Sequence, residues 1–295
     1  KVKKGQFEPV GAMYVEPDCN IPCAESLIRQ CLYGQKTYKR MFGKYVNNAW
    51  LPDVFGNSWI MPQILKKSGV DYFVSNKMST WNDTNRFPHN NFIWKGIDGS
   101  SVYACVPPTH FITWNAPSQI QENWEAYIDK DQGGQTMNMF GYGDGGSGCT
   151  EEKNLKDKKN LEGWDGELYL EMHSGTFTTK SNLKQKNRQL EFKFRTAEML
   201  SVLRGDDNRD TLTALYKKFL VNQFHDILPG SHIHPVYEDA MADYAEIEIA
   251  LDEIIGTGSK YFNTLNFERN ALTFVPNKTG SATRHGAKGN WLVPS

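Results

Sequence analysis

The sequence predicts an α/β domain, followed by an α-helical three-helix bundle and the start of an all-β domain. Over residues 1–160, short apolar runs bounded by turn signals alternate with segments of helical periodicity, and such alternation is typical of α/β folds. Over residues 161–256, three amphipathic patterns follow one another. Residues 257–295 change to β-type segments that look like a β domain cut short.

The α/β part alternates predicted strands and helices along the chain. Its first half contains an extended segment at 7–15, a helix at 24–41, a strand at 49–54, a helix at 58–68 and a strand at 70–75. The first helix is indicated by Leu27, Cys31 and Tyr38 along one side. Gly69 closes the second helix, since glycine is common directly after a helix end.

The second half of the α/β part contains a predicted hairpin and one further strand. Residues 92–96 and 102–106 flank Asp98-Gly99, which is a strong turn signal between two apolar strands. Residues 136–142 form the next strand and run into a glycine cluster at 143–148.

Three apolar stripes predict the three helices of the bundle. The stripes consist of Leu183, Leu190, Phe194, Ala197 and Leu200; of Leu212, Leu215, Phe219 and Leu220; and of Met241, Tyr244, Ile247, Leu251 and Ile254. Pro229-Gly230 separates the second helix from the third, and Pro235 suits the first turn of the third.

Composition excludes several classes of protein. With 33 basic and 34 acidic residues the net charge is -1, whereas a nucleic-acid or membrane-surface protein needs a concentrated basic patch. No apolar run reaches the roughly 18 to 20 residues of a membrane span. The 5 cysteines form no C-x-x-C pair, so neither a disulfide framework nor a thiolate zinc site is indicated. Free thiols suit a reducing compartment, and we expect a cytoplasmic protein, or a vacuolar one in a eukaryote. Whether the protein forms a homo-oligomer stays open.

Asp53 is the first candidate for chemistry. It lies in W-L-P-D-V-F-G at residues 50–56, at the predicted carboxyl end of a strand, where α/β enzymes commonly place catalytic groups. The local pattern alone favours a simpler interpretation, in which Asp53 stabilises the turn or caps the next helix.

His225 and Asp226 are the second candidate, within N-Q-F-H-D-I-L-P-G at residues 222–230. Imidazole is the usual nitrogen ligand of zinc, and an adjacent carboxylate can bind a sugar hydroxyl. The alternative is a histidine that interacts with a helix C-terminus. His232 and His234 could also chelate a metal, but the turn before Pro235 gives this pair an ordinary surface explanation, and we favour it less than His225.

Asp144 is the third candidate, within G-Y-G-D-G-G-S-G at residues 141–148. This cluster lacks the Lys-Ser or Lys-Thr ending of a P-loop and the spacing of a dinucleotide-binding motif, so phosphate binding is a poor interpretation. Glycines around a single carboxylate let a bulky ligand approach the backbone closely. A flexible loop is the alternative.

Taken together and in order, these motifs resemble glycoside hydrolase family 38. Residues 50–100 carry W-L-P-D-V-F-G, P-Q-I-L-K-K-S-G, W-N-D-T-N-R-F-P-H and W-K-G-I-D-G-S. The resemblance extends upstream through F-E-P-V-G and V-E-P-D-C-N, and downstream through Y-G-D-G-G, G-E-L-Y-L-E-M-H and Q-F-H-D-I-L-P-G-S. The resemblance is strongest to the branch that contains bacterial and cytosolic or vacuolar enzymes.

The resemblance implies a zinc-dependent, retaining exo-α-mannosidase that removes terminal α-D-mannosyl residues from oligosaccharides or N-glycan-derived glycans. The catalytic domain would be a seven-stranded, barrel-like α/β domain at 1–160 with its N-terminal part missing, followed by the bundle at 161–256 and a truncated β-sandwich at 257–295. The metal would be Zn²⁺, with Co²⁺ as the alternative.

Residue roles follow from the same resemblance. Asp53 would be the nucleophile and a zinc ligand, and His225 a second ligand. Asp226 would hold sugar hydroxyls, and Asp144 would be the general acid/base. Lys77 would lie near the nucleophile, where a cation keeps a carboxylate ionised. Trp81, Asn82 and His173 fall in segments that resemble substrate-lining loops.

One feature of the family's pattern is absent upstream of Asp53. The family's remaining zinc ligands come from an H-x-D segment, and no histidine precedes Asp53. Two further hypotheses therefore accompany the enzyme: a non-catalytic carbohydrate-binding remnant, and an inactive structural fragment. A zinc ion held by Asp53 and His225, with an upstream histidine and aspartate completing its site, would separate the enzyme from both.

Overall fold

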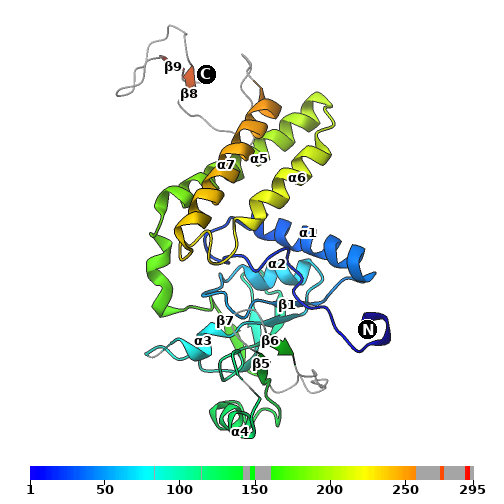
Figure 1. The fold of residues 1–295 in the computed structure, drawn as a ribbon, viewed down its shortest axis with the longest axis vertical. Helices are drawn as coiled ribbons and strands as arrows, with labels where there is room; N and C mark the ends of the chain where they lie inside the picture. The colour runs from blue at the N-terminus through cyan, green and yellow to red at the C-terminus, as the bar shows by residue number, and fades with distance from the viewer. Residues whose placement is uncertain are drawn as a thin grey trace.

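The computed structural model describes residues 1–82, 84–113, 115–141, 147–149, 161–256, 273–275 and 290–292. Strands and short helices gather at one end of the molecule, and three long helices extend from the other (Figure 1). Helix α1 (Ala24–Phe42) lies between the two groups. The predicted α/β class is confirmed in this mixed arrangement, in whose main sheet parallel strand pairs predominate.

The main sheet has five strands in the order β1-β2-β4-β3-β7. They are β1 (Asn48–Trp50), β2 (Tyr72–Val74), β3 (Asn91–Lys95), β4 (Ser101–Cys105) and β7 (Gly163–Asp165). Strands β1, β2 and β4 run parallel, β3 is antiparallel to β4, and β7 is parallel to β3. The β3–β4 pair is the predicted hairpin, and Gly99 turns it with φ 79°. Closure into a seven-stranded barrel stays a prediction.

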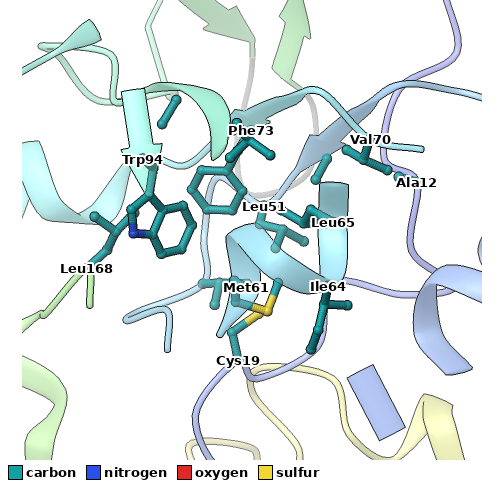
Figure 2. Packing of buried hydrophobic residues seen from close by; sticks show 14 of the residues in the cluster. Ala12, Cys19, Leu51, Met61, Ile64, Leu65, Val70, Phe73, Trp94 and Leu168 are labelled. Atoms are coloured by element: carbon teal, nitrogen blue, oxygen red, sulfur yellow. The ribbon is translucent and has the colours of Figure 1, made fainter. Parts of the chain in front are cut away.

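Helix α2 (Met61–Lys67) packs its apolar side against this sheet. Leu51, Met61, Leu65 and Phe73 have almost no exposed surface and lie together between helix and strands (Figure 2). Trp94 of β3 closes the cluster, and its indole N–H donates to the Gly166 carbonyl at 2.7 Å. The ring is therefore fully buried without leaving its indole N–H unpaired.

Helix α1 matches the predicted helix at 24–41. It ends where Gly43 takes a left-handed conformation with φ 76°. A Cβ on Gly34 would lie 2.3 Å from the Ala12 carbonyl oxygen, so the helix backbone packs directly against the segment around residue 12. The extended segment predicted at 7–15 contributes an isolated parallel bridge from Gly11 to Ala49 and no regular strand.

Three consecutive helices share the second core. They are α5 (Ser181–Arg204), α6 (Arg209–Val221) and α7 (His234–Ile255). The predicted stripes face inward: all members of the first two are buried, and Tyr244, Ile247 and Leu251 of the third are buried as well. Pro235 lies in the first turn of α7, as predicted. Stripe spacing alone was therefore sufficient to find these helices.

Shorter elements complete the described residues. They are η1 (Val2–Lys4), α3 (Lys77–Thr80), α4 (Pro117–Ala126), β5 (Met139–Gly141), β6 (Ser147–Cys149), η2 (Glu171–Phe177), β8 (Thr273–Val275) and β9 (Asn290–Leu292). Strand β1 is shorter than predicted, and β5 begins later than predicted. Helix α2 also begins later than the predicted residue 58, because its proline, Pro62, suits the first turn of a helix. Within the described ranges, no helix has the length and apolar character of a bilayer span.

Candidate active site

Asp53 and Lys77 come from the ends of two neighbouring parallel strands. Strands β1 and β2 pair with Trp50 opposite Val74, and each charged residue follows its strand by three positions. Both side chains therefore emerge at the same carboxyl edge of the sheet, where α/β folds bind ligands. The Lys77 ammonium Nζ lies 2.6 Å from Asp53 Oδ1. Strand register thus brings the turn that carries Asp53 beside the start of α3 (Lys77–Thr80), where the ion pair forms.

His225 approaches Asp53 from the loop that follows α6. Its backbone N–H and its ring Nδ1 both contact the Glu16 carbonyl oxygen, at 3.1 Å and 2.9 Å. A carbonyl can only accept, so Nδ1 carries the hydrogen. Nε2 then faces Asp53 Oδ2 at 3.3 Å, on the carboxylate oxygen that Lys77 does not contact.

Residues 16–19 hold the two halves of the site together. Pro17 forms an antiparallel bridge with Phe224, next to His225. Cys19 forms a parallel bridge with Asn57, just beyond the turn that carries Asp53. This short segment therefore lies between the sheet end and the helical region and contacts both.

The charges at the site stabilise an ionised Asp53. Burial raises the pKa of Asp53, but the hydrogen bond with His225 and the ion pair with Lys77 outweigh burial and lower this pKa to about 2. Burial lowers the pKa of His225, yet the Asp53 carboxylate and the Glu16 carbonyl raise it above its ordinary value. Burial, together with the Asp53 charge, raises the pKa of Glu16 to about 7.

Asp53, His225 and Asp226 form a group that can hold a metal ion. Their ligand atoms all lie within 4.8 Å of one another. Two ligands at about 2.1 Å from one tetrahedral zinc ion are about 3.4 Å apart, so small side-chain movements bring these three into position. One imidazole and two carboxylates suit Zn²⁺ or Co²⁺. Asp226 is oriented by the Ser231 hydroxyl, which donates to Oδ1 at 2.9 Å.

Comparison with known proteins identifies the family. Residues 1–189 match the family described as Glycosyl hydrolases family 38 N-terminal domain, and residues 171–261 match the Alpha mannosidase middle domain. The chain is a member of glycosyl hydrolase family 38.

Curated members of family 38 resemble the chain over most of its length. Alpha-mannosidase G of Dictyostelium discoideum is 36% identical over 289 residues, covering 86% of this chain and 26% of its own. Human alpha-mannosidase 2C1 is 36% identical over 280 residues, covering 83% of this chain and 27% of its own. The chain thus spans about a quarter of the length of these relatives. A solved alpha-mannosidase from Enterococcus faecalis V583 shares the fold, with a TM-score of 0.76, 16% identity, and coverage of 93% of this chain and 38% of its own.

Aromatic rings line this family 38 site. His173 stacks on Phe55 with ring centres 4.5 Å apart, and Phe55 meets His225 edge-on at 6.1 Å. The Lys77 ammonium lies 4.7 Å from the centre of the Trp81 ring. Burial and the Lys77 charge lower the pKa of His173, which favours the neutral ring. Trp81 and His173, both predicted to line the substrate, therefore lie beside Lys77 and Phe55.

The amide of Asn82 contacts the backbone on both sides. Its Nδ2 donates to the carbonyls of Met78 and Tyr169, at 3.2 and 3.3 Å, and its Oδ1 accepts from the Glu171 N–H at 3.1 Å. Asn82 thereby ties α3 to the segment that leads to His173. Its predicted contact with substrate stays a prediction. Asp144, the predicted acid/base, lies outside the described residues.

Two residues of the site received no role from the sequence. Glu16 was recognised only within the V-E-P-D-C-N motif, and Phe55 only within W-L-P-D-V-F-G. A glutamate between an apolar run at 12–15 and a proline was the available signal for Glu16. Its significance depends on the distant residue His225, which local pattern does not reveal.

Proposed function

We propose that the chain carries the central part of a retaining exo-α-mannosidase site, with Asp53 as the nucleophile. The observation that carries the proposal is an aspartate kept ionised between Lys77 and His225, at the carboxyl end of a strand, in a family 38 chain. Curated relatives are named alpha-mannosidases, which supports α-mannosides as the substrate class. An α-mannoside oligosaccharide is the proposed partner.

Retention requires two displacements at the anomeric carbon. In the first, Asp53 forms a bond to this carbon while the glycosidic C–O bond breaks and an acid gives its proton to the leaving oxygen. In the second, the same acid, now a base, takes a proton from water, which attacks the anomeric carbon and frees Asp53. We assign the acid/base role to Asp144, in the glycine cluster. Lys77 keeps Asp53 charged before attack, as a nucleophilic carboxylate requires.

Asp53, His225 and Asp226 would hold Zn²⁺, with Co²⁺ as the alternative. The ion when bound supplies a template and positive charge for neighbouring sugar hydroxyls. His225 is fixed for ligation because the Glu16 carbonyl holds its Nδ1–H and leaves Nε2 free to face Asp53. We further propose that Asp226 accepts hydrogen bonds from sugar hydroxyls, and that Trp81 and His173, held in place by Asn82, face the sugar ring.

The larger architecture belongs to the same proposal. The five-stranded sheet would be part of the seven-stranded, barrel-like catalytic domain, α5 to α7 would form a separate bundle domain, and residues 257–295 would begin a β domain. The proposed compartment is the cytoplasm, which suits the thiols of Cys19, Cys23 and Cys31, none of which forms a disulfide in the described part of the chain.

Hydrolysis of an aryl α-mannoside by the chain supplied with Zn²⁺ tests the proposal. Asp53→Asn keeps the size of the side chain but removes the nucleophile, and we expect kcat to fall about 10³-fold or more. Asp71→Asn is the matched control, because Asp71 forms an exposed ion pair with Lys66 away from the site. Full activity in Asp53→Asn would contradict the assignment. Mannoside binding without hydrolysis by the unmodified chain would favour a carbohydrate-binding remnant.

A further inference from the structure

A small polar cluster lies inside the largely apolar core of the helical region. Asn187 of α5, Tyr244 of α7 and Gln223, which follows α6, are all almost completely buried. Gln223 Nε2 donates to Asn187 Oδ1 at 3.1 Å, and the Tyr244 hydroxyl donates to the same oxygen at 3.4 Å. Burying an amide in an apolar core is unfavourable unless the amide is hydrogen-bonded, so the bond to Asn187 fixes where the Gln223 side chain can lie.

The main chain of Gln223, two residues before His225, begins a short antiparallel ladder with residues 16–18. The Gln223 carbonyl accepts from the Asp18 N–H at 2.9 Å. The ladder ends where the His225 N–H donates to the Glu16 carbonyl at 3.1 Å, and that carbonyl also accepts from the imidazole Nδ1 at 2.9 Å. Gln223 therefore has its main chain in the ladder that orients His225 and its side chain in the helical core.

We propose that Gln223 is a positioning residue, whose hydrogen bond with Asn187 holds the His225 imidazole at the site. The inference rests on the ligand role of His225 in the proposed function and adds a residue to it. Without this bond, residues 223–225 would be free to shift relative to α5, and the distance of 3.3 Å between His225 Nε2 and Asp53 Oδ2 would change. Residues that orient metal ligands commonly change metal affinity about 10- to 100-fold when they are lost.

Two substitutions remove the opposite partners of this hydrogen bond. Gln223→Met keeps the length of the side chain but has no donor, and Asn187→Leu keeps a similar volume but has no acceptor. The double variant tests whether both act through the one bond, because the effects of two partners in one interaction are not additive. Tyr244→Phe is the matched control, since it removes the other donor to Asn187 Oδ1 and leaves the bond with Gln223 in place.

Nitrogen NMR of the His225 ring in the metal-free chain, at one pH, reports the hydrogen bonds of that ring. We expect the ring signals to shift in both single variants, to shift no further in the double variant, and to be unchanged in Tyr244→Phe. Thermal unfolding checks that each variant folds. Unchanged ring signals in both single variants would overturn the proposal. An equal shift in Tyr244→Phe would overturn it as well, because a general loosening of the helical core would then explain the effect.

Titration with Co²⁺, whose visible absorption reports affinity and ligand geometry, tests the consequence for the metal site. We expect Gln223→Met and Asn187→Leu to bind Co²⁺ about 10- to 100-fold more weakly and with an altered spectrum, and Tyr244→Phe to stay within about threefold of the unmodified chain. Failure of the unmodified chain to bind Co²⁺ would refute the metal site of the proposed function. Normal affinity and a normal spectrum in Gln223→Met would refute the positioning role.

Amide hydrogen exchange in the unmodified, metal-free chain tests the same point without a substitution. If Gln223 fixes the ladder to the helical core, the Asp18 N–H, which donates to the Gln223 carbonyl, should exchange about as slowly as the N–H of buried Leu190 in α5. Exchange at Asp18 about 100-fold faster than at Leu190 would overturn the proposal, because the ladder would then open while the helical core stays closed.

Discussion

Lys77→Met should raise the pKa of Asp53 in the metal-free protein. The substitution keeps most of the side-chain volume and removes the ammonium that lies 2.6 Å from Asp53 Oδ1. The pKa of Asp53 stands at about 2 against an ordinary 3.8, although burial acts in the opposite direction. His225 and Lys77 both lower the pKa of Asp53. The loss of Lys77 should therefore raise this pKa by about one unit or more, which corresponds to about 1.4 kcal/mol.

Carbon NMR of the Asp53 carboxyl group, with a chelator present, measures this change. With a pKa of about 2, Asp53 is about nine-tenths ionised at pH 3; with a pKa of about 3, it is about half ionised. Asp53→Asn identifies the signal. Lys66→Met is the matched control, because Lys66 forms an ion pair of similar length, 2.5 Å, with Asp71 on the surface.

The lowered pKa of Asp53 also makes the stability of the folded protein depend on pH. Because folding lowers the pKa of Asp53, its contribution to the free energy of unfolding is present above pH 3.8 and is lost as pH falls towards 2. Lys77→Met should make that loss smaller. An Asp53 titration that is the same in Lys77→Met and in the unmodified chain would refute the role of Lys77.

Three further substitutions test the packing and hydrogen bonding of the fold. Gly34→Ala would place a Cβ 2.3 Å from the Ala12 carbonyl oxygen, and we expect a loss of about 1–3 kcal/mol in urea unfolding, against almost none for Gly134→Ala, whose Cβ meets nothing. Trp94→Ala removes a fully buried ring and should lose about 3–5 kcal/mol in the same assay. Lys184→Met leaves three backbone carbonyls without their donor and should lose about 1–3 kcal/mol. Burial lowers the pKa of Lys184 from 10.5 to about 8, so between these pH values the unfolded chain binds more protons than the folded one. The free energy of unfolding should therefore rise as the pH increases from about 8 to 10.5, and Lys184→Met should lack that rise.

Local pattern predicted the elements whose signal lies within the element. The apolar residues of α5, α6 and α7 repeat with helical spacing, so their spacing along the sequence is enough to predict which of them are buried. The hairpin β3–β4 was found for the same reason, because its two strands flank a single turn. Strand β1 was predicted too long, since residues after Trp50 are as apolar as those within it but leave the sheet to form the turn that carries Asp53.

The site itself depends on contacts between distant parts of the chain. The meeting of Asp53 with Lys77 follows from the register of β1 and β2, which a local pattern does not define. The approach of His225 depends on the carbonyl of Glu16, a group that every residue carries and that no motif marks. Assignment of these residues from sequence therefore rested on resemblance to family 38.

Mass spectrometry can show directly whether Asp53 bonds to the sugar. A fluorinated α-mannosyl fluoride, which forms the glycosyl ester quickly and hydrolyses slowly, is incubated with the Zn²⁺-supplied chain, and the labelled peptide is sequenced after digestion. We expect one mannosyl group on Asp53 and none in Asp53→Asn. A label on Asp226, or on any carboxylate that persists in Asp53→Asn, would contradict Asp53 as the nucleophile.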